Sequence, residues 1–153
     1  MRPDDWNAWA PSWPLKVVCA HCATTNRLLA SKLNDQPICG RCHRPLFFGT
    51  PIHVDTASFD VHIGQSDIPV LVEFAAASAD QGSLHQVATA LEPAARLAMV
   101  NAESNVELVT RFAVTSSPTF IVFWKGREIG RRVGAIPPVS SLVSWVRSSV
   151  FEQ

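Results

Sequence analysis

The chain has 153 residues, of which 47% are hydrophobic and 17% are charged. This composition provides enough apolar side chains for a packed core and excludes a chain that is disordered throughout. Lys and Arg together number 13, as do Asp and Glu, so the net charge of zero argues against nucleic-acid binding driven by phosphate neutralisation. The first third of the chain is nevertheless basic, with six basic and three acidic residues in 1–50.

Residues 1–16 form an arm rich in tryptophan and proline. Trp6, Trp9 and Trp13 are spaced as on one face of a helix, but Pro11 would interrupt a regular helix. We expect these rings either to pack onto the domain that follows or to anchor another protein, because tryptophan is enriched at interface hot spots. The arm has no apolar run typical of a secretion signal, and no stretch of the chain reaches 18 uncharged apolar residues. A cytoplasmic protein without membrane contact is therefore expected.

All four cysteines fall between residues 19 and 42, in two C-x2-C motifs separated by sixteen residues: Cys19, Cys22, Cys39 and Cys42. This spacing predicts one zinc ion held by four thiolates, and a shell of four sulfurs leaves no open position for catalysis. The zinc is therefore expected to be structural. The alternative is a redox-active dithiol or redox sensor that uses the same cysteines. Basic residues close by in sequence would offset the negative charge of the centre: Arg27, Lys32, Arg41 and Arg44.

From residue 51 onward, strand-like and helix-like patterns alternate. Apolar runs predict strands at 69–77, 97–100, 119–124 and 129–133, and periodic patterns predict helices at 84–91, 105–112 and 139–150. Lys125-Gly126-Arg127 between the last two strands indicates a hairpin. This order predicts an α/β domain with a central sheet of mixed direction.

The chain resembles the thioredoxin 2 family, bacterial thioredoxins with an N-terminal zinc ribbon. The resemblance rests on the two C-x2-C motifs and on motifs in the second half: Val72-Glu73-Phe74, Val100-Asn101-x-Glu103, the segment from Arg111 to Thr119, and Gly134-Ala135. It implies a thioredoxin fold, in which helices flank a central mixed β-sheet, preceded by a zinc ribbon. The expected division is an arm at 1–16, the ribbon at 17–50 and a thioredoxin-like domain at 51–153.

The resemblance fails where the family has its catalytic W-C-G-P-C motif. Ala79 and Gly82 match the two cysteine positions, and Ser78 matches the flanking tryptophan. The family's buried acid is kept as Glu73, but Met99 matches its lysine partner. These differences predict that the protein has no catalytic dithiol at this site and is not an enzyme.

Pro118 matches the family's cis-proline, beside which an extended substrate peptide pairs with the main chain. With Ser117, Ala75, Ser78 and the three tryptophans of the arm, it is expected to bind a protein partner. The sequence therefore predicts a redox-inactive adaptor, chaperone or assembly factor for a client protein, such as an enzyme or an exported effector. Thiol-disulfide exchange or redox sensing by the ribbon cysteines is the main alternative, and nucleic-acid binding by the basic ribbon is a third.

Overall fold

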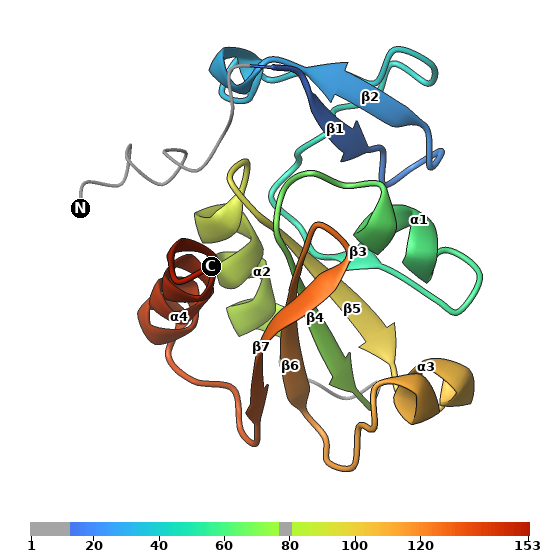
Figure 1. Ribbon diagram of the computed structural model, residues 1–153, viewed down its shortest axis with the longest axis vertical. Coiled ribbons are helices and arrows are strands. Elements are labelled where there is room, and N and C mark those ends of the chain that lie inside the picture. Colours follow the sequence, from blue (N-terminus) through green and yellow to red (C-terminus); the bar gives the residue numbers. More distant parts are fainter. Residues whose placement is uncertain (1–12, 77–80) are drawn as a thin grey trace.

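The computed structural model describes residues 13–76 and 81–153. A small N-terminal unit contains an antiparallel hairpin of β1 (Leu15–Val18) and β2 (Thr25–Leu28), followed by a short 3-10 helix at Ala30–Lys32. This unit sits at one end of a larger α/β domain (Figure 1).

The larger domain is built on one five-stranded sheet with the spatial order β3-β5-β4-β6-β7. Its strands are β3 (Ile52–His53), β4 (Val70–Ala75), β5 (Arg96–Asn101), β6 (Thr119–Trp124) and β7 (Arg127–Val133). The pairs β3–β5 and β4–β5 are parallel, whereas β4–β6 and β6–β7 are antiparallel. The mixed direction predicted from the sequence is confirmed.

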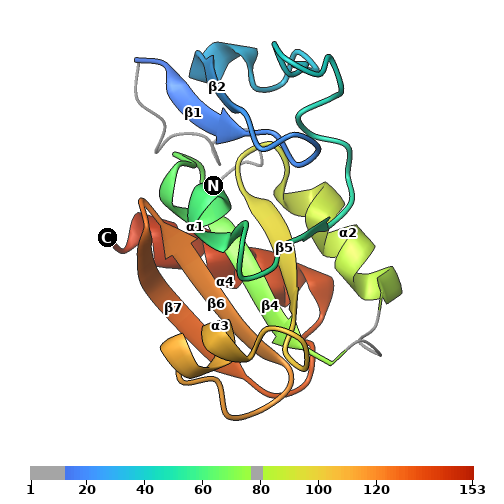
Figure 2. The same ribbon diagram turned by 90° about the vertical axis from the view of Figure 1, so that its right-hand side faces the viewer.

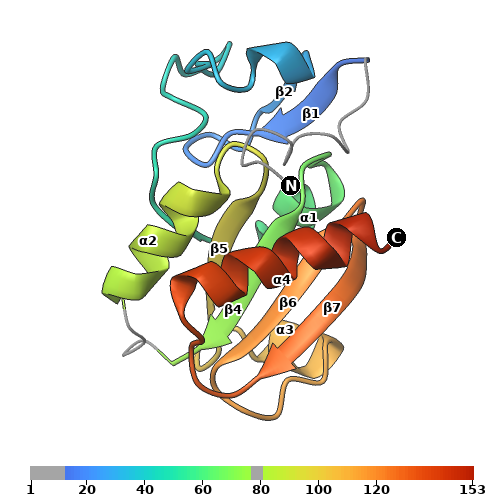
Figure 3. The same cartoon turned by 90° about the vertical axis from the view of Figure 1, so that its left-hand side faces the viewer.

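Helices cover both faces of this sheet (Figures 2 and 3). They are α1 (Phe59–Gly64), α2 (Gln81–Leu91), α3 (Val106–Arg111) and α4 (Val139–Phe151). In α2 the buried positions Leu84, Val87, Ala88 and Leu91 repeat with the helical period, so one apolar stripe faces the sheet. They form a core with α4, while a second core lies between the opposite face and α1 and α3. Because strand side chains alternate, β4 sends Leu71 into the first core and Val72 into the second.

The N-terminal unit shares its core with the larger domain. Its buried cluster consists of Leu15, Val17, Cys19, Leu33, Cys39 and Leu46, together with Ile68 from the loop before β4. Lys16 also joins the two parts, because its N–H donates to Asp67 Oδ2 and its C=O accepts from the Asp67 N–H, both at 2.8 Å. Packing of the ribbon therefore depends on the domain that follows it in sequence.

Most elements after residue 69 match the sequence prediction, but the last hairpin is tighter than expected. Lys125 and Gly126 have φ values of 54° and 77°, which form a two-residue turn, so that β7 begins at Arg127 instead of Ile129. The structure also contains β1, β2, β3 and α1, for which the sequence patterns gave no prediction. Among the described residues, no helix combines the length and apolar character needed to cross a membrane.

Candidate functional site

The four cysteines lie on two turns of the same local form. After Cys19 the chain reverses through hydrogen bonds from Ala23 N–H to Cys19 O and from Cys19 N–H to Thr24 O, both at 2.9 Å. After Cys39, His43 and Arg44 repeat this pattern with lengths of 3.0 and 2.8 Å. Ala23 and His43 also share a positive φ, 62° and 63°. Each turn therefore presents its two sulfurs on the same side.

The two turns bring all four sulfurs together. The Cys19 and Cys42 Sγ atoms are 3.6 Å apart, as are those of Cys22 and Cys39, and all four lie within 4.8 Å of one another. In a tetrahedral zinc site with bonds of about 2.3 Å, the sulfurs are about 3.8 Å apart. The donor set and its spacing therefore fit a Zn(Cys)4 centre with no open position.

Main-chain N–H groups point at two of these sulfurs. His21 N–H donates to Cys19 Sγ and Arg41 N–H donates to Cys39 Sγ, both at 3.4 Å, and Asn26 Nδ2 approaches Cys39 Sγ at 3.5 Å. A hydrogen bond from the Cys42 main chain is the largest effect on the pKa of Cys39, which falls to about 5, whereas burial raises the pKa of Cys19 to about 11. Donors around a sulfur favour its thiolate, the form that binds a metal.

Arg96 of β5 lies between the ribbon and the larger domain, and the sequence analysis did not find it. Its side chain is 2% exposed and donates to the main-chain carbonyls of Val18 and Leu46, and its guanidinium lies 5.0 Å from the centre of the Phe47 ring. Burial lowers the pKa of Arg96, and the charges of Glu92 and Cys19 raise it. The only signal in the sequence was an arginine at the start of an apolar strand.

The basic residues that were expected to offset the charge of the centre are placed differently. Arg27, Lys32, Arg41 and Arg44 are all exposed. Lys32 pairs with Asp35 at 3.7 Å. The buried cation that lies close to a cysteine is therefore Arg96, which comes from a strand more than 50 residues after the last cysteine.

A second candidate region lies at the other end of the domain, where the Ser117–Pro118 peptide bond is cis. Ser117 Oγ accepts a hydrogen bond from the Ala76 N–H at 3.2 Å, and Pro118 O accepts one from the Gly134 N–H at 3.0 Å. Ser117 is exposed, and its own main-chain N–H and C=O have no hydrogen-bond partner among the described residues. The loop thus presents one free donor and one free acceptor just before the proline.

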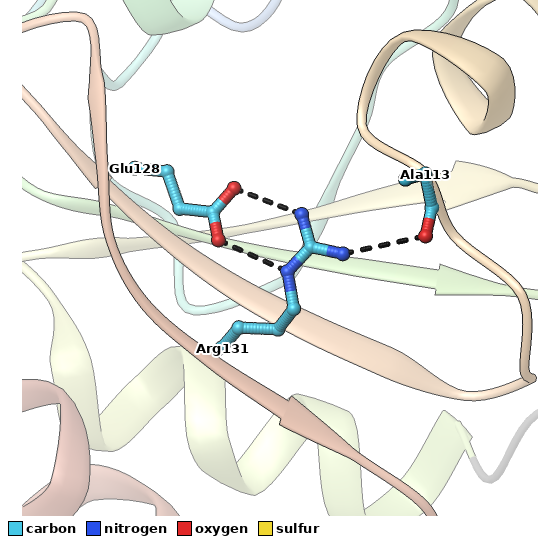
Figure 4. A network of polar contacts seen from close by, with 3 residues as sticks. All are labelled: Ala113, Glu128 and Arg131. Atoms are coloured by element: carbon cyan, nitrogen blue, oxygen red, sulfur yellow. Dashed lines mark hydrogen bonds and ion pairs between the residues drawn. The ribbon is translucent and has the colours of Figure 1, made fainter.

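Arg131 of β7 fixes the chain that leads into this loop (Figure 4). It forms two hydrogen bonds of 2.9 Å with the Glu128 carboxylate and reaches Ala113 O at 3.5 Å. Ala113 has a φ of 51°, a left-handed conformation that a non-glycine residue rarely adopts. The Glu128–Arg131 pair therefore contacts the chain where it turns from α3 towards Ser117.

The other predicted partner-binding residues are distributed unevenly. Ala75 is 5% exposed, so its methyl group offers little surface, while Trp13 is 68% exposed. Ser78 and Ala79 lie outside the described residues, as do Trp6 and Trp9, and Gly82 is in the first turn of α2. The expected binding role of these residues stays a prediction.

Glu73 and Met99 are neighbours in the sheet, as the resemblance implied, because the register of β4 and β5 pairs them directly. Glu73 is 1% exposed, and its Oε2 has no hydrogen-bond partner among the described residues. Burial raises the pKa of this carboxyl group to about 7.

The sheet order, the flanking helices and the cysteine cluster define a thioredoxin-fold protein with an N-terminal ribbon module. Residues 18–44 match the family described as Thioredoxin 2, N-terminal, and residues 50–148 match the family described as Thioredoxin. The chain therefore belongs to the thioredoxin family.

Individual relatives agree with this assignment. Thioredoxin C-3 of Corynebacterium nephridii is 31% identical over 141 residues, which cover 90% of this chain and 97% of that protein. Thioredoxin of Rhodospirillum rubrum is 29% identical over 102 residues, covering 63% of this chain and 97% of its own. The solved structure of a mutant thioredoxin from Halobacterium salinarum NRC-1 superposes with a TM-score of 0.57 over 67% of this chain and 92% of that one; at 23% identity it supports the fold alone.

These relatives contradict the prediction that the protein is not an enzyme. They carry the name thioredoxin, and thioredoxins are thiol-disulfide oxidoreductases. The prediction rested on Ala79 and Gly82 at the two cysteine positions, together with Ser78 and Met99, and of these Ser78 and Ala79 lie outside the described residues. It gave too little weight to the four thiols that the chain keeps in one cluster, and nothing in the described residues shows that the chain is inactive.

Proposed function

We propose that this thioredoxin-family protein binds an extended segment of a client protein beside Ser117 and cis-Pro118, and so acts as an adaptor, chaperone or assembly factor. The observation that supports this most directly is the exposed Ser117, whose main-chain N–H and C=O have no partner among the described residues. An extended chain that pairs with such a residue gains main-chain hydrogen bonds whatever its side chains are, as in strand addition.

The surroundings of Ser117 support the same role. The loop is held from two sides, by the Ala76 N–H just after β4 and by the Gly134 N–H just after β7. A loop fixed in this way loses less conformational freedom when a ligand binds, which favours affinity. Because this binding needs no thiol, it is compatible with helping a client to fold, with delivering or assembling it, and also with reducing it.

We also propose that the ribbon binds one structural zinc ion through its four cysteines, because their mutual distances match a tetrahedral site. Zinc-bound thiolates must remain reduced, which fits a cytoplasmic location. The zinc would hold the two turns together and keep the ribbon folded against Ile68.

Client binding is tested with the full-length protein carrying a photo-crosslinking amino acid at Thr115, with the same label at Glu152 as the control position. The probe is a reduced, carboxymethylated and therefore unfolded ribonuclease. We expect crosslinks from position 115 and few from position 152. Ser117→Pro, which removes the N–H donor, should weaken crosslinking at least fivefold, whereas Ser117→Ala, which keeps it, should not. Equal crosslinking from both positions, or no difference between the two variants, would show that this loop is not the binding site.

A second candidate function is thiol-disulfide exchange by the ribbon cysteines. It is favoured by the family, and by the fact that the chain has no cysteines besides these four. The two functions are separated by insulin reduction in the presence of dithiothreitol, with zinc content followed in parallel. If the protein reduces insulin and Cys22→Ser abolishes this turnover, the ribbon has a redox activity. If Cys22→Ser still crosslinks to the client, client binding does not depend on the ribbon thiols and the first proposal stands.

A further inference from the structure

Met99 is the one methionine of the chain beyond residue 1, and it lies in β5, next to the edge strand β3. It is partly buried and packs against the core between the sheet, α2 and α4. It also lines two cavities of about 470 and 210 Å³, both open to solvent. Because its main chain is paired with β3 on one side and β4 on the other, the side chain is the part that faces these cavities.

The larger cavity gives small solutes a way to the Met99 side chain. Its walls come from the first metal-binding turn, from the segment that leads into β3 and from α2, which lies alongside β5 (Figure 2); they include Ala20, Phe48, Pro51 and His85. A water molecule occupies about 30 Å³, so this cavity also admits a molecule of the size of hydrogen peroxide. A thioether within reach of such a solute is open to oxidation.

Glu73 lies beside Met99 on the same face of the sheet. Leu71, two residues earlier in β4, belongs to the core of α2 and α4, so the alternation of a strand turns Glu73 towards that core as well. The register of β4 and β5 pairs Glu73 directly with Met99. Neighbouring strands are about 4.8 Å apart, so the two long side chains are within reach of each other.

The Glu73 carboxyl group has an unmet need for a hydrogen-bond partner. It is 1% exposed, and its Oε2 has no partner among the described residues. Burial raises the pKa of Glu73 to about 7, so near neutral pH a large part of the protein carries the protonated form, which has an O–H to donate. The thioether of Met99 is a weak acceptor, whereas the oxygen of a sulfoxide is polar and accepts hydrogen bonds well.

We propose that Met99 is a site of reversible oxidation, at which hydrogen peroxide from the cavity converts the thioether to a sulfoxide whose oxygen then accepts a hydrogen bond from the protonated Glu73 carboxyl group. In this step a sulfur lone pair forms the S–O bond to one peroxide oxygen, and the O–O bond breaks. The proton on the transferred oxygen passes through solvent to the departing hydroxide, which leaves as water. The sulfur is oxidised by two electrons and the peroxide is reduced.

The neighbouring carboxyl group favours the oxidised form over that of an ordinary buried methionine. A sulfoxide without a donor in the interior costs the desolvation of a polar group, and a buried carboxyl group without an acceptor carries a similar cost. Pairing the two offsets both. The unbranched methionine side chain has three rotatable bonds, so it can turn the new oxygen from the cavity towards Glu73. The site senses peroxide without using the ribbon thiols, and it does not depend on the proposed client binding.

Access to the thioether is tested with hydrogen peroxide on the full-length, zinc-loaded protein. After the reaction is stopped with catalase, trypsin releases residues 97–111, which contain Met99 and no cysteine, and mass spectrometry measures the fraction that has gained one oxygen. We expect oxidation of the folded protein at a rate within about threefold of that in urea, and reversal by methionine sulfoxide reductases after unfolding. Oxidation more than about a hundredfold slower in the folded protein would show that peroxide does not reach Met99 and would overturn the proposal.

The hydrogen bond from Glu73 is tested by infrared difference spectroscopy between the oxidised and reduced protein at about pH 6, where this carboxyl group is mostly protonated. We expect the C=O stretch of a protonated carboxyl group to move to lower wavenumber on oxidation. The shift should be absent in Glu73→Gln, which has no carboxyl group, and in Met99→Leu, which keeps the cysteines but cannot form the sulfoxide. An oxidised wild type whose carboxyl band does not move, or a shift that Met99→Leu retains, would overturn the pairing of the sulfoxide with Glu73.

Stability gives a second measurement of the same pair. The melting temperature of the wild type should change little when Met99 is oxidised, whereas that of Glu73→Leu, which offers no donor, should fall by several degrees. Glu73→Gln keeps an N–H donor and should behave like the wild type. An equal fall in wild type and Glu73→Leu would mean that Glu73 does not stabilise the sulfoxide. Should Glu73→Leu not fold, the infrared shift in the wild type decides.

Discussion

Arg96 joins the two parts of the molecule through main-chain carbonyls, one from each end of the ribbon. A buried arginine needs partners for its donors, because leaving them unpaired in the interior costs several kcal/mol. Val18 O directly precedes the first cysteine, and Leu46 O follows the last by four residues. The guanidinium therefore bridges the chain where it enters and where it leaves the metal-binding turns.

Replacing Arg96 with methionine tests this bridge. Arg96→Met keeps an unbranched apolar stem but removes the guanidinium and leaves two carbonyls without their donor, so we expect the free energy of unfolding to fall by about 2–4 kcal/mol. The ribbon should also release zinc to a chromogenic chelator several times faster than in the wild type. Arg27→Met, at an exposed position in β2, is the control and should change neither value by much. Zinc release at the wild-type rate from a destabilised Arg96→Met protein would mean that Arg96 supports only the larger domain.

Glu73 predicts a pH dependence with a definite sign. Its carboxyl group titrates near 4.5 in the unfolded chain and at about 7 in the folded one. The stabilising effect of the neutral form is complete below pH 4.5 and is lost as the pH rises through 7, because the unfolded chain gives up its proton first. The loss amounts to up to about 3 kcal/mol at pH 8.

Glu73→Gln stays neutral and should escape this loss. We expect its free energy of unfolding, measured relative to wild type, to increase between pH 4.5 and pH 8 by up to about 3 kcal/mol. Taking the difference between variants removes the pH dependence of the zinc thiolates, which both proteins share. Glu103→Gln, an exposed position, should show no such change. A pH-independent difference for Glu73→Gln would mean that the buried carboxyl group finds a compensating partner.

The difference between Cys19 and Arg96 shows which residues of a site the sequence can predict. The cysteines were found because their spacing is local: each pair lies in one turn, and the two turns resemble each other. Arg96 comes from a strand more than 50 residues after the last cysteine, and its role depends on a tertiary contact that no sequence period records. Arg41 and Arg44, to which the sequence assigned charge compensation, are exposed, so water screens their charges more than it screens that of buried Arg96.

At the scale of elements, predictability followed length and periodicity. Helix α4 was found almost to the residue, because thirteen residues with a regular apolar stripe give a clear period. Strand β3 has two residues and α1 has six, which is too short for any period to emerge. These two elements form because Ile52 and Phe59 pack into the second core, so tertiary packing and not a local sequence pattern determines them.

The Glu128–Arg131 pair gives a prediction for the loop before cis-Pro118. Arg131→Ala removes the contact with Ala113 O, and the two side chains are about one third exposed, so we expect a modest loss of about 0.5–1 kcal/mol. The local effect should be larger than the global one, with faster hydrogen exchange at residues 112–117. Arg127→Ala, in the same strand but outside this network, is the control. Equal exchange in both variants would show that the cis-proline loop keeps its form without the arginine.

At the scale of the whole molecule, the ribbon and the larger domain pack against each other across one interface. Ile68 enters the ribbon core, Arg96 binds its carbonyls, and Asp67 pairs with Lys16. The fold class could be predicted from the sequence because the motifs of a known family marked most of the elements. The interface between the ribbon and the larger domain could not be predicted, because its residues come from three places in the chain and share no sequence pattern. The division at residues 16 and 50 stays a prediction.

Removal of zinc tests how strongly this interface couples the stability of the ribbon to that of the larger domain. The ribbon cluster contains six residues from a segment of about thirty, among them Cys19 and Cys39, so without metal its core is too small to hold the turns together. We expect a chelator to increase hydrogen exchange at residues 15–47 at least a hundredfold, with a smaller increase near Ile68 and Arg96 and none in the middle of β4. The remaining domain should lose about 1–2 kcal/mol of stability, which for about 100 residues lowers its melting temperature by roughly 4–16 °C. Re-addition of zinc should reverse every change. If the chelator leaves exchange in the ribbon unchanged, the cysteines do not hold a structural metal; if β4 melts together with the ribbon, the two parts form a single cooperative unit.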